Sequence, residues 1–116
     1  MNINDIEIER SVIGEILSFE SLKEKALLLE PGDFAYDEHR DICKAMISQA
    51  KNGKYDFVTV AAECGSSYRA EIQNCIQTAI SEALFEEHFK ILKEMASRRR
   101  LISRFQTLTL EGDVSV

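Results

Sequence analysis

Hydrophobic side chains recur every three or four residues along most of the chain, which is the spacing that buries one face of an α-helix. The first such face lies in residues 4–18 and is formed by Ile8, Val12 and Ile16. Asn4 or Asp5 precedes it as a capping residue, because a short polar side chain accepts hydrogen bonds from the first unpaired backbone N–H groups. Gly14 costs about 1 kcal/mol relative to alanine in mid-helix, and we therefore expect another helix to pack closely against it.

Capping and turn residues place the next elements. Ser21 and Glu24 have the spacing of a capping box, which predicts a short second helix over residues 21–29. The sequence Glu30-Pro31-Gly32-Asp33-Phe34 is the strongest turn signal in the chain, because proline cannot continue a helix and glycine accepts the dihedral angles of a reversal.

A third helix is predicted over residues 37–50, and Asn52-Gly53 favours a left-handed cap at its end. The next segment, Phe57-Val58-Thr59-Val60, is rich in β-branched residues and in isolation indicates a strand. No second strand is available to pair with it, so we predict a short fourth helix over residues 57–63, capped by Asp56 and ended by Gly65.

The last part of the chain is also helical in pattern. A fifth helix begins at Ser67, a break is expected near residues 78–81, and a long final helix runs from Glu82 to Leu108. Residues 109–116 are expected to be a frayed tail. The fold class predicted is all-α: residues 1–116 form a single domain, a compact orthogonal bundle of about six helices with a long C-terminal helix.

Composition agrees with one helical domain. The chain has 116 residues, of which 45% are hydrophobic, and it contains only one proline. Its three cysteines (Cys43, Cys64 and Cys75) are an odd, widely spaced set without a CxxC motif, which favours reduced thiols in the cytoplasm over a disulfide framework or a zinc ribbon. No apolar run approaches the ~20 residues that span a bilayer, and the N-terminus does not have the pattern of a secretion signal.

The net charge of −6 is unevenly distributed. Residues 1–40 carry ten Asp or Glu against four Lys or Arg, whereas the charges of residues 41–116 balance. An acidic first part does not suit a nucleic-acid clamp, because affinity for phosphates depends on lysine and arginine.

Residue patterns that carry chemistry are weak. The sequence contains none of GxxxxGK[ST], GxGxxG, HExxH or GxSxG. His39 and Cys43 share a helix face and could form half of a metal site, but no second pair stands at a suitable spacing, so a partly buried pair is favoured. Glu86-Glu87-His88 is interpreted as a solvated helix face. We therefore expect this chain on its own not to be an enzyme, with no catalytic, cofactor-binding or metal-binding residue, and neither to bind nor to hydrolyse nucleotide.

The clearest polar group is arginine-rich: Arg98, Arg99, Arg100 and Arg104. Arginine binds carboxylates and phosphates through two parallel hydrogen bonds, so these residues are the candidate partner-binding site. Three interpretations stay open: charges that complement the C-terminal end of the helix dipole, contact with an acidic protein surface, or contact with nucleic acid. The group lacks interleaved aromatic residues, which makes it a poor platform for single strands.

Four motifs, in order and spacing, resemble the N-terminal domain of DnaB-type replicative DNA helicases. They are the run from Ile6 to Gly14, the residues Asp33-Phe34 with His39-Arg40-Asp41-Ile42 and Ala45-Met46, the segment Gly53–Val60, and Glu94 with Arg98-Arg99-Arg100-Leu101-Ile102. Together they cover roughly residues 5–105. Glu87-His88 depart from the pattern, since the family often has two tyrosines there.

The resemblance implies a cytoplasmic, non-catalytic domain that acts in DNA replication. In that family the domain packs into a collar on a hexameric ring and docks primase, so the implied partners are primase, other helicase subunits and a helicase loader, with DNA bound weakly or through the parent protein and no membrane. ATP and Mg would belong to the motor domain of a parent helicase. Because the family's dimer contact lies largely in a following helical hairpin, we expect at most weak self-association. The alternatives are the helicase-binding domain of a primase, which has a similar helical fold, and a small helical DNA-binding module.

Overall fold

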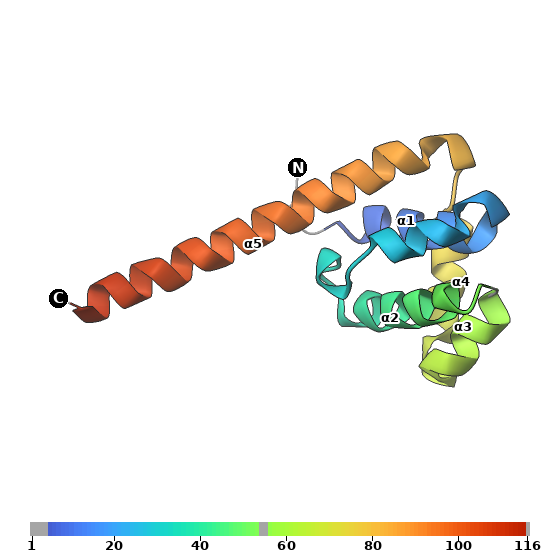
Figure 1. Cartoon of the computed structure of the whole chain (residues 1–116), viewed down its shortest axis with the longest axis horizontal. Helices are drawn as coiled ribbons and strands as arrows, with labels where there is room; N and C mark the ends of the chain where they lie inside the picture. The colour runs from blue at the N-terminus through green and yellow to red at the C-terminus, as the bar shows by residue number, and fades with distance from the viewer. Residues whose placement is uncertain (1–4, 54–55, 116) are drawn as a thin grey trace.

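The structure, a computed structural model, describes residues 5–53 and 56–115, with side chains up to residue 106. These residues form α-helices joined by short 3₁₀ turns, and they contain no strand (Figure 1). The elements in chain order are α1 (Ile6–Ser18), η1 (Glu20–Leu28), η2 (Pro31–Asp33), α2 (Asp37–Lys51), α3 (Phe57–Cys64), η3 (Ser66–Tyr68), α4 (Arg69–Thr78), η4 (Glu82–Leu84) and α5 (Phe85–Ser115). The predicted all-helical fold with a long last helix is confirmed.

Two predicted caps are present. The Asp5 carboxylate accepts the backbone N–H of Glu7 at 2.9 Å and that of Ile8 at 3.3 Å, which begins α1. At the start of α3, the Asp56 carboxylate accepts the Thr59 N–H at 2.9 Å, while the Asp56 N–H donates to the Thr59 hydroxyl at 2.9 Å. This reciprocal pair satisfies donors that a helix start otherwise leaves unpaired. The hydrogen bonds lower the pKa of the Asp56 carboxyl.

The segment from Phe57 to Val60 is helical, as predicted against its β-branched composition. Val60 is fully buried and Phe57 packs against the core, so tertiary contacts on one face of the short helix override local propensity. The preceding helix, α2, ends where predicted: Gly53 has a φ of 83°, the left-handed conformation that glycine adopts without strain.

Four predicted element types or boundaries differ from the structure. One is the start of the long last helix: α5 begins at Phe85, after the 3₁₀ turn η4, rather than at Glu82. The second element is a 3₁₀ helix without a side-chain cap, because the Ser21 hydroxyl donates to the Glu82 carboxylate across the fold rather than to its own helix start. The fifth helix begins at Arg69, after the separate 3₁₀ turn η3. The backbone of α5 is helical to Ser115, beyond the predicted end at Leu108, and no proline follows Leu108 to stop it.

The core surrounds α1, which lies between α4 and the first half of α5. Phe85, Leu92, Met95 and Ala96 bury one side of α5 against the bundle. Beyond these residues α5 projects away from the other helices (Figure 1). The long helix therefore has one half that belongs to the core and one half that is exposed.

Candidate interaction surface and its ionic supports

The projecting half of α5 carries exposed apolar side chains. Leu101 is 69% exposed, Ile102 43% and Phe105 70%. With the exposed Arg98 they occupy positions i, i+3, i+4 and i+7 of one helix face, the spacing by which a helix presents an apolar stripe to a partner. We call these four residues the α5 face, and the exposed Arg104 flanks it.

The arginines singled out by the sequence divide into two pairs. Arg99 donates to the Asp33 carbonyl oxygen at 2.9 Å, and Arg100 donates to the Asp33 carboxylate at 3.1 Å. Both therefore contact η2 within the same chain. Arg98 and Arg104 lie on the solvent-exposed surface of α5.

Asp33 fixes α5 to the rest of the bundle. Its side chain is fully buried and its carboxylate accepts the Lys93 ammonium at 2.7 Å and the Glu30 backbone N–H at 2.8 Å. A buried carboxylate is tolerated only when such partners replace its lost hydration. The turn that the sequence predicted at Glu30–Phe34 thus serves as an anchor for the helix that bears the exposed face.

A second buried carboxylate holds the start of α5 to α1. The Glu15 side chain is fully buried, and its two oxygens lie 3.0 and 2.9 Å from His88 Nδ1. The interpretation of residues 86–88 as a solvated face is wrong for His88, whose side chain is only 13% exposed. Glu86 and Glu87 are exposed, as expected.

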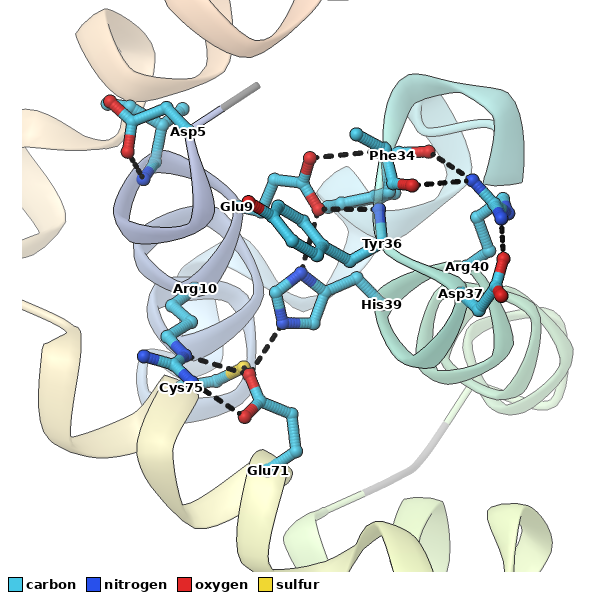
Figure 2. Close-up of polar contacts among 12 residues, drawn as sticks. Asp5, Glu9, Arg10, Phe34, Tyr36, Asp37, His39, Arg40, Glu71 and Cys75 are labelled. Carbon is cyan, nitrogen blue, oxygen red and sulfur yellow. Dashed lines mark hydrogen bonds and ion pairs between the residues drawn. The ribbon is translucent and has the colours of Figure 1, made fainter. Parts of the chain in front are cut away.

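The third polar group joins α1, α2 and α4 through His39, whose side chain is 1% exposed (Figure 2). His39 Nδ1 lies 2.7 Å from a Glu9 oxygen, and His39 Nε2 lies 2.6 Å from a Glu71 oxygen. On the far side of Glu71, Arg10 donates to both carboxylate oxygens at 2.8 and 2.9 Å. Glu9 also accepts the Ala35 backbone N–H at 2.8 Å.

These contacts change the proton affinity of the group. Burial alone raises the pKa of Glu71, but the hydrogen bonds from Arg10 and His39 outweigh it and lower the pKa to about 2. Burial lowers the pKa of His39, and the hydrogen bonds to Glu9 and Glu71 more than reverse this, so the pKa is raised above its ordinary value. The Glu71 carboxylate and the His39 imidazole thus favour their charged forms.

His39 and Cys43 share a face of α2, but the described residues that bring three potential metal ligands together are a different set. Ligand atoms of His39, Glu71 and Cys75 all lie within 4.8 Å of one another. However, His39 and Glu71 are already in direct contact, and the Arg10 guanidinium occupies both Glu71 oxygens. A metal ion would have to displace that cation, so the trio is better explained as an ionic network.

The three cysteine side chains lie in the core or pack against it. Cys43 and Cys75 are fully buried, and burial raises the pKa of Cys43 to about 12 and that of Cys75 further. Cys64 is half-buried, and its pKa is raised to about 11 for the same reason. Reactive cysteines have lowered pKa values, whereas burial raises the pKa of each of these three thiols.

Sequence reasoning missed the buried carboxylates Glu9, Glu15 and Asp33, because each has a partner far away along the chain. Arg10 and Glu71 are 61 residues apart, and Glu15 and His88 are 73 apart. One local signal was available: Glu9 stands three residues before Val12 and Glu15 three residues after it, so helical spacing places both beside the apolar face of α1.

Fold and surface together define a small all-helical domain in which buried ion pairs hold a long helix with an exposed apolar face. The sequence matches the family described as DnaB-like helicase N-terminal domain over residues 1–94. The chain belongs to this family. A solved structure that it resembles is the N-terminal domain of DnaB helicase from Mycobacterium tuberculosis, with a TM-score of 0.89 and 26% sequence identity, covering 99% of this chain and 89% of that one.

The comparison with curated proteins found no match. The resemblance stated from the four sequence motifs is confirmed by the family match and by the structural likeness. None of the described helices combines the length and apolar character needed to cross a membrane.

Proposed function

We propose that this chain is a non-catalytic assembly and primase-docking module of a replicative DNA helicase, acting in the cytoplasm during DNA replication. The observation that carries the proposal is the α5 face, an exposed apolar stripe on a helix that projects from the bundle of a DnaB-type domain. Soluble domains rarely leave large apolar side chains together in water unless a partner covers them.

Assembly with other helicase subunits is the role we assign to the apolar part of the α5 face. Leu101, Ile102 and Phe105 form the kind of stripe that packs into a groove or against another helix. The anchors at Asp33 and Glu15 fix the direction in which α5 leaves the bundle, so a neighbouring subunit would meet the stripe in one orientation. Rigid presentation reduces the entropy that association costs.

Primase docking is the role we assign to the exposed arginines. Arg98 and Arg104 can form charge-assisted hydrogen bonds with carboxylates on a partner. A helicase loader would meet the same projecting helix. ATP and Mg would act in the motor domain of the parent helicase and not on this chain.

Calorimetric titration of the C-terminal fragment of the cognate primase into this domain tests docking. We expect saturable heat with the unmodified chain. The double variant Arg98→Ala/Arg104→Ala should bind more weakly, and the loss of one close ion pair lowers the affinity by about tenfold. The matched control is Arg69→Ala/Lys51→Ala, which removes the same charge from exposed positions on α4 and α2.

Arg99 and Arg100 are left unchanged in that design, because they hold Asp33 and their loss would disturb α5. Absence of heat with the unmodified chain would contradict primase docking. Equal affinity of the double variant and the unmodified chain would contradict the arginine assignment. Steeply salt-dependent binding of DNA, without binding of primase, would support the DNA-binding alternative instead.

A further inference from the structure

The His39 ring is the one described side chain that joins three helices through two carboxylates, and its protonation state follows from the geometry. A neutral imidazole has one N–H donor and one bare nitrogen. Here each ring nitrogen faces a carboxylate oxygen, at 2.7 Å to Glu9 and 2.6 Å to Glu71. With a neutral ring, one of these contacts would place a nitrogen lone pair against an oxygen lone pair.

The missing proton is not supplied by either carboxyl group. Glu71 accepts two hydrogen bonds from Arg10 and a third from the Asn74 amide at 3.2 Å, so its oxygens are already acceptors. Glu9 accepts the Ala35 backbone N–H through its other oxygen. Carboxylates surrounded by donors favour the ionised form.

The balance of charges around His39 also favours a protonated ring. Glu9 and Glu71 carry two negative charges, and Arg10 supplies one positive charge. The solvent-exposed Glu7 also lies 3.5 Å from Arg10 and adds a further negative charge outside the buried group. A protonated His39 makes the group neutral, whereas a neutral His39 leaves one uncompensated negative charge beside a ring that is 1% exposed. The same elements also present Tyr36 from the segment before α2 and Cys75 from α4, and Cys43 lies one turn further along α2. None of these three supplies a positive charge.

We propose that His39 is a buried imidazolium at neutral pH, and that it acts as a pH-sensitive lock that ties α1 and α4 to α2. The contacts of His39 with Glu9 and Glu71 are both favourable while the ring carries a proton on each nitrogen. When the ring loses one proton, the contact with Glu9 or Glu71 becomes repulsive and the three helices are held less tightly.

The direction of the pH dependence follows from linkage. The folded-state pKa of His39 lies above its unfolded value. The lock therefore contributes fully below the unfolded pKa, and its contribution is lost as the pH rises through the folded pKa. A device of this kind is distinct from the proposed docking role, since it concerns the bundle and not the α5 face.

Long-range ¹H–¹⁵N spectra of the unmodified chain test the proposal directly, because the chain has only two histidines. At pH 7.5 we expect both His39 nitrogens to show the chemical shifts of a protonated ring. The spectrum of His88 serves for comparison, since Nδ1 is the ring nitrogen for which a carboxylate contact is seen, whereas both nitrogens of His39 have one. A His39 spectrum with one bare nitrogen at this pH would overturn the proposal.

Two further measurements follow, one on a variant and one on the unmodified chain, so that the proposal stays testable where the variant does not fold. In Glu9→Gln the midpoint of the His39 titration should shift to lower pH, whereas Glu24→Gln, at an exposed position of η1, should leave it unchanged. Equal midpoints would contradict the lock. Addition of Zn²⁺ to the unmodified chain should leave both ring N–H signals of His39 in place. Stoichiometric displacement of one ring proton by zinc would show a metal site and overturn the proposal.

Discussion

A Cβ atom on Gly14 would lie 1.8 Å from the carbonyl oxygen of Cys75 and 2.5 Å from its carbonyl carbon. The backbones of α1 and α4 thus meet at this point without space for a methyl group. The close packing that the sequence predicted at Gly14 is confirmed, and the helix against which it packs is α4.

Gly14→Ala should therefore destabilise the domain, although alanine is the better helix former by about 1 kcal/mol. The clash is with backbone, so the two helices must move apart, and we expect a net loss of about 1–3 kcal/mol in the free energy of unfolding. Urea denaturation measures it. Gly32→Ala is the control, because its Cβ would meet nothing nearer than the Arg100 side chain at 3.5 Å. A variant at Gly14 as stable as the control would contradict this account.

Local signals explain which parts of the fold could be predicted from the sequence. Asp5, Asp56 and Gly53 act on neighbouring backbone groups, and the elements they begin or end are placed correctly. Ser21 has the same local pattern, but its hydroxyl finds Glu82, 61 residues away, and the predicted cap does not form.

The candidate site shows the same difference between local signals and contacts that are distant along the chain. The long last helix could be predicted from helical spacing, together with the positions of Arg98 and Arg104 on it. The exposure of Leu101, Ile102 and Phe105 could not, because an apolar stripe at this spacing usually faces a core. The partners of Glu9, Glu15 and Asp33 could not be predicted, because no local sequence pattern indicates which cationic side chain contacts each buried carboxylate. His88 was misread as solvated for this reason, since its contact with Glu15 exists only in the folded bundle.

Lys93→Ala should weaken the anchor between η2 and α5. Asp33 would stay buried with Arg100 as its remaining cationic side chain, and an incompletely compensated buried carboxylate costs about 1–3 kcal/mol. The matched control is Lys90→Ala, one turn away on the exposed side of α5, for which we expect a change within about 0.5 kcal/mol. Thermal and urea denaturation of both variants compare the two positions, and equal losses would contradict the anchor.

Acid should destabilise the domain through Glu71. Its pKa is lowered to about 2 in the folded chain, so its contribution is present above its ordinary value of 4.5 and is lost as the pH falls from there toward 2. The linked free energy is about 3 kcal/mol at most. Glu71→Gln should flatten the acid limb of the stability profile, while Glu24→Gln should retain it. An unchanged acid limb in Glu71→Gln would refute this assignment.

Self-association, where it occurs, should depend on the α5 face. We expect weak, concentration-dependent association of the unmodified chain in sedimentation experiments. Leu101→Glu/Phe105→Glu should abolish it, because two charges cannot be buried in an apolar contact without partners. Val58→Glu, at a residue of α3 that is 60% exposed, is the control and should associate like the unmodified chain. Undiminished association of the double variant would place the contact elsewhere.

The projecting part of α5 is the surface on which we propose that partners dock. An amide ¹H–¹⁵N footprint of the labelled domain, recorded as the cognate primase fragment is added, tests it most directly. We predict shifts or broadening concentrated in residues 98–105, with the amides of α3 unchanged. A footprint confined to α3 and α4, or no change at saturating primase, would contradict the claim.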